Sequence, residues 1–549
     1  MSTARLRVGV LLDSTTVPRW IERILEGLRA SEVATLELVV VRGGGRPPRA
    51  GSGRVARRLF ALYEGADAGF FRAPNDHAAP VEAEPHLLGA KRLHVTPAAR
   101  GEWEELAPPD VDAIRDQGLD VLVQLGFGRL RGDVLEAARW GLWTFAHEEA
   151  ARVGAPPFFW EMALEQPLTE TALVRIVPGG GPPVPVYRSF GATDLTSLDR
   201  GRNAARWKST AFVERALRRL ALEGELAPAE ALLGPAPALP ARAPSALEVA
   251  RFGARLVRRV ARNRVQLRRY EHPWLVAVRR ARSDALEFEA LSGFEEVPAP
   301  PDRFWADPCV VHAGGQHYLF FEDGDIASEK GRVCALSIAP DGTRSEPWIV
   351  LERDYHLSYP YLFAWRDAWW MLAETSENRT VELYRAVDFP RRFELERVLF
   401  QDVVAVDPTL IEHGGRFWLF LAMSAAGGPV NDELFLFHAD SPLGGWRPHP
   451  QNPVVSDVRR ARPAGRPFRR DGVLLRPGQD CSAAYGGAIW VCRIDALDER
   501  TYRETPIAHL LPNWLPGLTA THALSRDGDW EAIDGRRLVP RRGSAPQRA

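Results

Sequence analysis

Cysteine is scarce in this sequence, and its few copies are poorly spaced for chemistry. The 549 residues include four cysteines, at positions 309, 334, 481 and 492. No two of them form a Cys-x-x-Cys pair or a spacing typical of a metal site. We therefore expect buried, reduced thiols and no metal bound by cysteine.

The sequence also lacks an excess of charge and a long apolar run. The formal net charge is −1, which provides no bulk attraction to nucleic acid or to an anionic membrane. No apolar run approaches the roughly 20 residues that a membrane-spanning helix needs. The short apolar run at the N-terminus is broken by Asp13, which makes it too weak for a signal peptide. We expect a cytoplasmic protein with no nucleic-acid partner and no transmembrane segment.

Turn-forming and aromatic residues, by contrast, are plentiful, with 44 prolines, 46 glycines and 17 tryptophans. The length exceeds what one hydrophobic core supports, so we expect two to four domains. Residues 1–220 alternate buried strand patterns such as "RLRVGVLL" with helix patterns at 17–30 and 131–141. Strands that alternate with helices predict a Rossmann-like parallel sheet, whose ligands bind at the carboxyl ends of the strands.

Residues 221–272 are expected to connect this domain to the next. The first part, 221–250, is rich in Ala and Pro and is typical of a linker. The second part, "ARFGARLVRRVARNRVQLRRY", has apolar residues near helical spacing with arginines around them. We favour a helix docked on the neighbouring domain with solvated or paired arginines. A helix lying on a membrane surface is the alternative.

From residue 273 to 540 the pattern changes to short aromatic and β-branched runs separated by Gly and Asp turns, which is typical of strands. Three units repeat clearly, starting near Asp307, Tyr359 and Asp407, which are 52 and 48 positions apart. A period near 50 predicts a β-propeller. With two looser units the span has room for five blades, and the last strand is expected to close the ring against the first blade. Residues 541–549 are expected to form a disordered tail.

In such a propeller the starts of the inner strands converge, so Asp307 and Asp407 could face one pocket. Carboxylates gathered from separate blades can bind sugar hydroxyls or supply the acid and base of glycosidic chemistry. They could also hold Ca²⁺ through their oxygens, although no metal motif is visible. Alternatively, each Asp-Pro pair only initiates a strand. The acids Glu322 and Asp323 are expected to form a solvated turn.

The motifs "FWADPCVV", "HYLFFED", "MLAETSENRTVELYRA", "DPTLIEHGGRFWLF" and "RPGQDCSAAYG" resemble the N-terminal domain of plant glucosamine inositolphosphorylceramide transferases. "WADP" with a second "DP" two units later also resembles the propellers of arabinanases, β-xylosidases and fructosidases. The glycosidase resemblance implies that Asp307 is the general base or nucleophile and that Asp407 orients the substrate and tunes pKa.

The same resemblance implies a glutamate as general acid on the fourth blade. The sequence has no glutamate between Glu433 and Glu499, so Asp480 or Glu374 would have to substitute. This departure favours sugar binding or an unusual transfer over hydrolysis. Three aromatic residues could stack on sugar faces or be buried in the blades: Trp305, Tyr359 and Tyr361.

Residues 115–175, with "LDVLVQLGFGRLRGDVLEAARWGLWTFAHEE", resemble the formyltransferases of methionyl-tRNA and sugar nucleotides. The resemblance implies 10-formyltetrahydrofolate as cofactor, bound beside an Asn-x-His pair. Thr144 stands at the Asn position, and His147 lies one residue beyond the His position. The nearest match to the family's Asp is Asp194. The glycine- and arginine-rich stretch 41–58 could bind phosphate, although a surface loop is favoured.

These patterns predict a carbohydrate-active enzyme that binds a saccharide, sugar nucleotide or glycoconjugate in the propeller channel, for glycosyl transfer or hydrolysis. One alternative is an N-formyl- or acyltransferase that acts on an amino-sugar nucleotide through the N-terminal domain. Another is a non-catalytic, glycan-binding scaffold. Peripheral membrane contact remains open for the basic helix.

Overall fold

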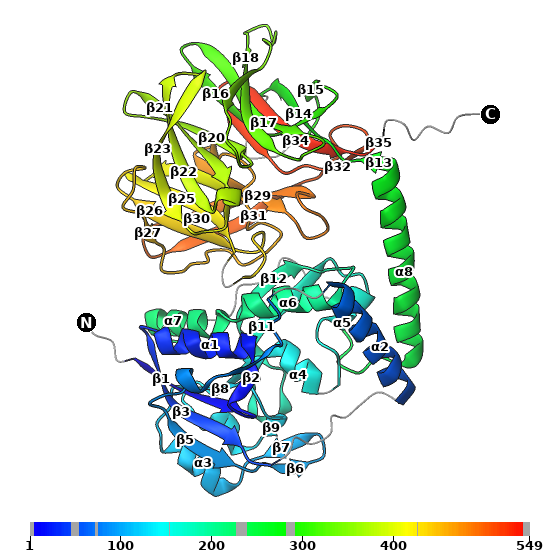
Figure 1. Ribbon diagram of the computed structural model, residues 1–549. Helices are drawn as coiled ribbons and strands as arrows, with labels where there is room; N and C mark the ends of the chain where they lie inside the picture. The colour runs from blue at the N-terminus through cyan, green and yellow to red at the C-terminus, as the bar shows by residue number, and fades with distance from the viewer. Residues whose placement is uncertain are drawn as a thin grey trace, which may run out of the picture. The chain divides into compact units, whose positions relative to one another are not determined.

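We describe a computed structural model of the chain, covering residues 5–44, 54–71, 75–152, 154–226, 239–281, 291–424 and 427–541. The chain divides into two compact units (Figure 1). The first comprises residues 1–261 with 425–428, and the second comprises 262–424 with 429–549. The first unit is a mixed α/β structure and the second consists of β-sheets. The combination of an α/β part and an all-β part is therefore confirmed.

The first unit is built on a seven-stranded sheet. Its strands lie in the order β12 (Val184–Ala192), β11 (Leu168–Arg175), β10 (Leu142–Phe145), β8 (Val121–Gln124), β1 (Leu6–Leu12), β3 (Ala34–Arg42) and β5 (Lys91–Val95). The five strands from β10 to β5 are parallel, and β11 and β12 are antiparallel. The central strands are apolar runs buried on both faces, as parallel strands require.

Eight α-helices occur in the described residues, seven of them in the first unit and the last running from the first unit into the second. They are α1 (Arg19–Ala30), α2 (Arg54–Phe71), α3 (Pro108–Arg115), α4 (Ala146–Arg152), α5 (Phe159–Ala163), α6 (Leu198–Ser209), α7 (Phe212–Glu223) and α8 (Ala246–Arg269). The short strands are β2 (Thr16–Pro18), β4 (Pro80–Glu82), β6 (Ala98–Arg100), β7 (Trp103–Glu105) and β9 (Arg129–Arg131). None of the helices in these ranges has the length and apolar character needed to cross a membrane.

Three local expectations need correction. The helix expected over 131–141 is only a 3₁₀ turn, Asp133–Glu136, because Gly132 and Gly141 take left-handed φ values of 81° and 76° at its two sides. The expected linker is helical at both ends, up to Glu223 and again from Ala246. The last residues of the glycine- and arginine-rich stretch already belong to α2. Residues 45–53, 227–238 and the tail 542–549 lie outside the described residues.

The second unit contains five antiparallel sheets of four or five strands. Four of them are made of consecutive strands: β16 (Arg303–Ala313), β17 (Gln316–Asp325), β18 (Gly331–Ile338) and β19 (Trp348–Leu351); β20 (Ser358–Trp365), β21 (Ala368–Thr375), β22 (Thr380–Asp388) and β23 (Arg392–Gln401); β24 (Ala405–His413), β25 (Arg416–Met423), β26 (Leu434–Ala439) and β27 (Arg447–Pro448); β28 (Phe468–Arg470), β29 (Val473–Asp480), β30 (Ala488–Leu497) and β31 (Tyr502–Leu510).

The fifth sheet joins the two ends of the unit. It contains β14 (Trp274–Arg280) and β15 (Glu295–Val297) from its start and β32 (Leu518–Ala520), β33 (Leu524–Asp527) and β34 (Trp530–Arg537) from its end. Strand β14 pairs antiparallel with β34 along its length, with Val276 opposite Asp534. The short strands β13 (Tyr270–Glu271) and β35 (Val539–Pro540) also pair. The C-terminal strands are thereby held against the first strands of the unit.

The three clear repeats share one backbone conformation at the start of β16, β20 and β24. Asp307, Tyr359 and Asp407 each precede a proline, each has a left-handed φ (51°, 47° and 52°), and each lies at a shift in strand register. Left-handed φ is uncommon for residues other than glycine and strains the backbone. Each is followed by a hairpin turn whose two central residues also have positive φ, as in a type I′ turn. These three residues therefore occupy equivalent places in three sheets.

A buried charge cluster holds the fourth sheet together. Arg476 on β29 is fully buried and donates hydrogen bonds from Nε and Nη2 to Glu504 on β31, at 2.8 and 2.7 Å. Arg460 and Tyr502 donate to the same carboxylate at 2.6 and 2.5 Å. Burial opposes the ionised form of Glu504, but the two arginines outweigh it and lower its pKa to about 2. The charged side chains are paired and hydrogen-bonded, which is the condition for burying them.

We predict that Arg476→Ala lowers the free energy of unfolding by about 3–5 kcal/mol, because it leaves a buried carboxylate short of a partner. The matched control is Arg392→Ala, which breaks the exposed pair with Glu394 and should cost less than about 1 kcal/mol. Urea denaturation followed by tryptophan fluorescence measures both. If the two variants lose the same free energy of unfolding, the prediction is contradicted, because the buried pair of Arg476 and Glu504 would then stabilise the fold no more than an exposed pair.

Candidate functional site

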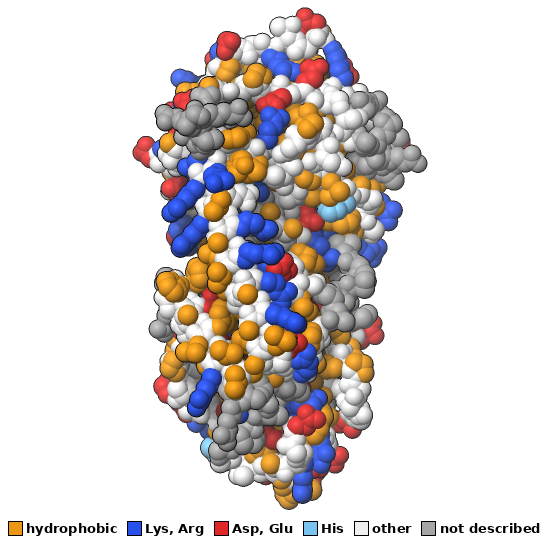
Figure 2. All heavy atoms as spheres, turned by 90° about the vertical axis from the view of Figure 1, so that its right-hand side faces the viewer, with side chains coloured by type: hydrophobic (Ala, Val, Ile, Leu, Met, Phe, Trp, Pro, Cys, Tyr) orange, Lys and Arg blue, Asp and Glu red, His pale blue; other side chains and the backbone are white. Residues whose placement is uncertain are grey.

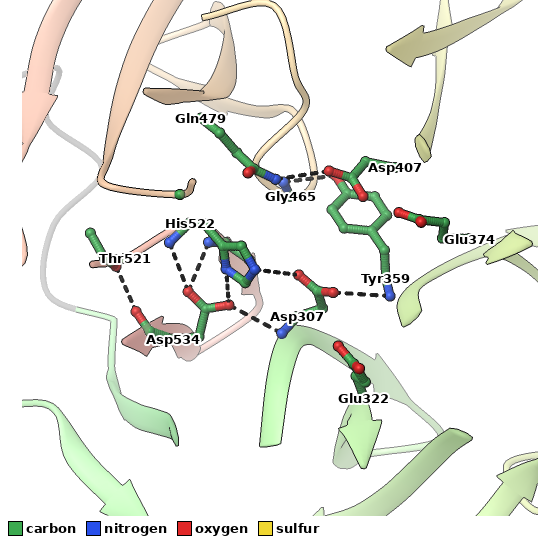
Figure 3. A network of polar contacts seen from close by, with 12 residues as sticks. Asp307, Glu322, Tyr359, Glu374, Asp407, Gly465, Gln479, Thr521, His522 and Asp534 are labelled. Atoms are coloured by element: carbon green, nitrogen blue, oxygen red, sulfur yellow. Dashed lines mark hydrogen bonds and ion pairs between the residues drawn. The ribbon is translucent and has the colours of Figure 1, made fainter. Parts of the chain in front are cut away.

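Three of the predicted acids lie together in the second unit, although they come from three different sheets (Figure 3). Asp307 is on β16, Glu374 on β21 and Asp407 on β24, and their exposed fractions are 7%, 8% and 1%. Asp407 and Glu374 are bridged by the same arginine, Arg462. The Asp307 carboxylate accepts a hydrogen bond from the backbone N–H of Tyr359, at the start of the second of these sheets.

Arg462 holds the Asp407 carboxylate in place. Its Nε donates to Oδ2 of Asp407 at 2.6 Å, and its Nη2 donates to Oδ1 at 3.1 Å and to Glu374 at 3.2 Å. Gln479 donates a further hydrogen bond to Oδ2 at 2.8 Å. Burial raises the pKa of Asp407 to about 7 against the effect of Arg462. Both oxygens of Asp407 are engaged, so this residue suits a fixed electrostatic role better than a nucleophilic one.

Asp307 is less fully engaged. Its Oδ2 accepts from the Tyr359 N–H at 3.2 Å, and its Oδ1 lies 3.6 Å from Nε2 of His522. Burial raises the pKa of Asp307 to about 6, with the nearby Asp407 acting in the same direction and His522 opposing it. Asp307 also lines a small cavity together with Tyr359, Gly465 and other residues. A carboxyl with a pKa near neutrality and spare hydrogen-bonding capacity is suited to proton transfer.

His522 and Asp534 orient this carboxyl from the fifth sheet. Nδ1 of His522 lies 2.5 Å from Oδ2 of Asp534, and the same oxygen accepts from the backbone N–H of Asp307 at 3.1 Å. Trp274 stacks on the imidazole, with ring centroids 3.9 Å apart. Burial lowers the pKa of His522, but Asp534 and Asp307 outweigh it, so that its pKa lies above the ordinary value. The raised pKa favours a protonated His522 beside the Asp307 carboxyl.

Sequence reasoning missed His522, Asp534, Arg462 and Gln479. A signal existed in the spacing, because Asp307, Tyr359 and Asp407 each lie seven positions before a hairpin turn, and His522 lies six positions before Gly528. Arg462 likewise precedes a proline, as the three repeated residues do. If the two looser units are aligned by the proline or by the hairpin turn, Arg462 and His522 fall at the positions that Asp and Tyr occupy in the three clear units.

One group of side chains in the described ranges could hold a metal ion. Asp307, His522 and Asp534 each offer one ligand atom, all within 4.8 Å of one another. One nitrogen and two carboxylate oxygens would suit a divalent transition metal. However, the imidazole and Asp534 are already paired at 2.5 Å, so a metal would have to replace that contact.

Asp480 does not join the three acids. Its carboxylate accepts from Ser482 Oγ at 2.6 Å and from Trp490 at 3.2 Å, and it lies 3.1 Å from Nε2 of His509. Successive side chains of a strand point to opposite faces. Gln479 therefore reaches Asp407, and its neighbour Asp480 points away from it.

The solvated turn expected at Glu322 and Asp323 is wrong. Strand β17 continues to Asp325, and the two acids are 6% and 5% exposed. Asp323 lies between Arg303 and Arg332, which each donate to it at 2.9 Å. Glu322 lies near the candidate site (Figure 3), where burial and then Asp307 raise its pKa well above the ordinary value. It adds a fourth acid that sequence reasoning assigned to solvent.

The three predicted sugar-stacking residues are buried, with 3–5% exposure. The indole of Trp305 donates to Asp323 at 3.0 Å, and the hydroxyl of Tyr361 donates to a backbone carbonyl. The hydroxyl of Tyr359 accepts from the N–H of Gly465 at 2.8 Å. The structure thus buries these rings, as the burial alternative expected.

The N-terminal candidates are also buried. Thr144 donates to the carbonyl of Gln124 at 3.2 Å and accepts from Arg152 at 3.1 Å. His147 is 6% exposed, and neither ring nitrogen has a hydrogen-bond partner among the described residues. Burial lowers its pKa to about 3, so the imidazole is neutral. Asp194 binds Thr196 and Arg200 in the turn before α6, which is a local structural role.

Residues 294–520 match the family model described as glucosamine inositolphosphorylceramide transferase 1, N-terminal. The relatives include glucosamine inositolphosphorylceramide transferase 1 of Arabidopsis thaliana, 37% identical over 211 residues, and its namesake of Oryza sativa subsp. japonica, 36% identical. Each match covers 38% of this chain and 28% of the plant protein. The resemblance predicted from the motifs is confirmed for this part of the chain.

Two solved structures have weaker similarity. A thermostable family-43 glycoside hydrolase is 15% identical with a TM-score of 0.30, covering 38% of this chain and 76% of that one. Zg3597, a family 117 glycoside hydrolase of Zobellia galactanivorans, is 13% identical with a TM-score of 0.32, covering 48% and 90%. Scores this low support no conclusion about fold or activity.

The raised pKa of Asp307 predicts a pH-dependent stability difference from Asp307→Asn. In the folded protein the pKa of Asp307 is about 6, above the ordinary value of 3.8, so the carboxyl keeps its proton to a higher pH than in the unfolded chain. The stability contributed by this proton is therefore complete at low pH and is lost as the pH rises through about 6. Relative to the wild type, the free energy of unfolding of Asp307→Asn should therefore rise by up to about 3 kcal/mol between about pH 4 and pH 7.

Urea unfolding of both proteins across this pH range measures the difference. Asp480→Asn is the matched control, because hydrogen bonds from His509 and Ser482 overcome burial and lower the pKa of Asp480. Relative to the wild type, the free energy of unfolding of Asp480→Asn should fall as the pH rises. A stability difference between wild type and Asp307→Asn that does not change with pH would contradict the raised pKa.

Proposed function

We propose that the second unit is a five-bladed β-propeller, each of its five sheets forming one blade, and that it binds and processes a saccharide or glycoconjugate at Asp307. The observation that carries the proposal is the meeting of Asp307, Glu374 and Asp407 from three sheets, with His522 and Asp534 from a fifth. The match of residues 294–520 to a family of glucosamine transferases supports a sugar as the ligand.

In this proposal Asp307 accepts the proton of an attacking hydroxyl. It is suited to this because its pKa is about 6 and only one of its oxygens accepts a backbone hydrogen bond. His522, held by Asp534, lies beside the same carboxyl and keeps it oriented. Asp407 is held in place by Arg462 and, in its ionised form, stabilises positive charge that develops on the sugar in the transition state.

The partner of Asp407 favours transfer over hydrolysis. In the glycosidases that the propeller resembles, the fourth blade supplies a glutamate as general acid. In this chain the segment before the fourth sheet supplies Arg462 instead. An arginine is always charged and cannot donate a proton as an acid. A departing phosphate needs no protonation and is well matched to a guanidinium. We therefore propose glycosyl transfer from a phosphate-activated sugar to a saccharide hydroxyl.

We also propose that the first unit is a Rossmann-like, formyltransferase-like domain, and that the protein is cytoplasmic. One observation favours formyl transfer as a second function, namely the neutral imidazole of His147, whose nitrogens have no hydrogen-bond partner. A neutral imidazole can polarise a carbonyl. The hydroxyl of Thr144, at the place of the family's Asn, is already committed to Gln124 and Arg152.

Asp307→Asn should lower sugar transfer by at least about 100-fold, because it removes the proton acceptor while keeping the shape of the side chain. Turnover on a panel of sugar nucleotides and glycoside acceptors measures the loss, and Asp480→Asn serves as a control whose carboxyl points away from the site. Wild-type turnover should rise with pH through about 6, as Asp307 ionises. Unchanged turnover in Asp307→Asn, or equal losses in the two variants, would refute the assignment.

For the first unit we expect saturable binding of tetrahydrofolate, weakened by His147→Ala and not by Asp307→Asn. Isothermal titration of the full chain provides the measurement. If no binding is detected at millimolar ligand, the folate version of the second function is eliminated.

A further inference from the structure

Helix α2 carries an apolar stripe that faces outward. Val55, Leu59, Leu62 and Phe70 follow one side of the helix at helical spacing, and their exposed fractions are 64%, 40%, 72% and 85%. An apolar stripe of this kind normally faces a protein core. Large exposed apolar patches on a soluble protein mark interaction sites.

An adjacent side of α2, roughly 90° around the helix from the stripe, is already used for packing. The ring of Phe60 packs edge-on against Phe159, with centroids 5.2 Å apart, and Tyr63 packs against Phe252 of α8 at 5.0 Å. Asp67, on the same side, accepts hydrogen bonds from the start of α6. The outward stripe is therefore a second apolar face, beyond what α2 needs for folding.

Helix α8, which touches α2 through Phe252, adds a dense row of positive charge. Figure 2 shows Lys and Arg side chains following one another beside hydrophobic ones on this face. Three arginines in the part of α8 that belongs to the first unit are exposed and have no ion pair with a described residue: Arg251, Arg255 and Arg258. Its one acid, Glu248, is bound by Arg242. Leu247 and Val257 are exposed among these arginines, at 58% and 70%.

We propose that the exposed stripe of α2 and the arginine face of α8 form a docking surface for an anionic lipid membrane, here called the α2–α8 surface. Arginines beside an anionic bilayer contribute about 1 kcal/mol each. Apolar side chains on the same surface enter the interface between headgroups and acyl chains. The chain as a whole has a net charge of −1, so the attraction is local to this surface. Attachment of this kind is peripheral.

The composition of the α2–α8 surface disfavours two other occupants. A two-fold dimer through it would bring identical surfaces together and place arginine rows near each other, which costs energy. A nucleic acid would satisfy the arginines, but it would gain nothing from Val55 and Leu62, which are more than half exposed. A membrane satisfies both features at once. This inference does not depend on the proposed sugar chemistry.

Co-sedimentation of the full chain with vesicles tests the proposal. We expect binding to phosphatidylcholine vesicles that contain phosphatidylserine, much weaker binding to phosphatidylcholine alone, and a steep decrease with salt. Arg251→Glu, Arg255→Glu and Arg258→Glu combined should weaken binding by roughly 100-fold or more. Leu62→Ser with Phe70→Ser should weaken it about 10-fold or more while leaving the salt dependence in place.

The matched control changes an equal number of exposed arginines elsewhere to glutamate: Arg447, Arg500 and Arg503. It should bind vesicles nearly as the wild type does, and circular dichroism should show that all variants are folded. The proposal is overturned if the wild type ignores anionic vesicles at low salt, or if the control loses binding as strongly as the α8 variant. It also fails if Leu62→Ser with Phe70→Ser binds vesicles normally but abolishes dimers, or if single-stranded RNA binds more tightly than vesicles.

Discussion

A single buried guanidinium holds the candidate site together. Arg462 lies between Asp407 of the third consecutive sheet and Glu374 of the second, and both acids are less than a tenth exposed. Without this cation, two buried carboxylates would face each other with no compensating charge, which proteins avoid by taking up protons or by unfolding. The backbone of this arginine accepts the N–H of Gln479, so its position is coupled to the edge of the fourth sheet. Burial of the acids and convergence of the sheets therefore depend on each other.

A second constraint acts on the backbone. The residues before Pro308, Pro360 and Pro408 take left-handed φ values, a conformation that costs energy for Asp and Tyr. The cost is accepted three times, at equivalent places in three sheets. At Asp307 the strained residue also donates its N–H to Asp534. The strain and the polar network thus occur at the same residues, as is common where a site must be held in one geometry.

The two halves of the chain use charge differently. In the second unit, charges are buried in pairs and triads, such as Arg476 with Glu504, and these shift the pKa values of their members. On α8, by contrast, Arg251, Arg255 and Arg258 remain exposed and form no ion pair with a described residue. Buried charge fixes geometry, because its energy depends strongly on distance in a medium of low polarity. Exposed charge of one sign instead attracts a partner over the range of a Debye length.

Much of the architecture could be read from the sequence. The change at about residue 273 from strand–helix alternation to short strands, and the recurrence of Asp307, Tyr359 and Asp407, depend on local periodicity and spacing. Local patterns of this kind are set by backbone geometry over a few residues. The same reasoning failed for the helix expected at 131–141, where two glycines with positive φ interrupt it. It also failed for Glu322 and Asp323, which look like a turn only if the strand is assumed to end before them.

The sequence by itself determined which residues start the repeated strands, and it singled out Asp307, Glu374 and Asp407 before any coordinates were known. Only the tertiary structure decided that Arg462, His522 and Asp534 complete their surroundings, and that Gln479 rather than Asp480 reaches Asp407. The reason is physical: contacts between residues 55 to 227 positions apart depend on how the sheets pack, and a one-residue change of register sends a side chain to the opposite face.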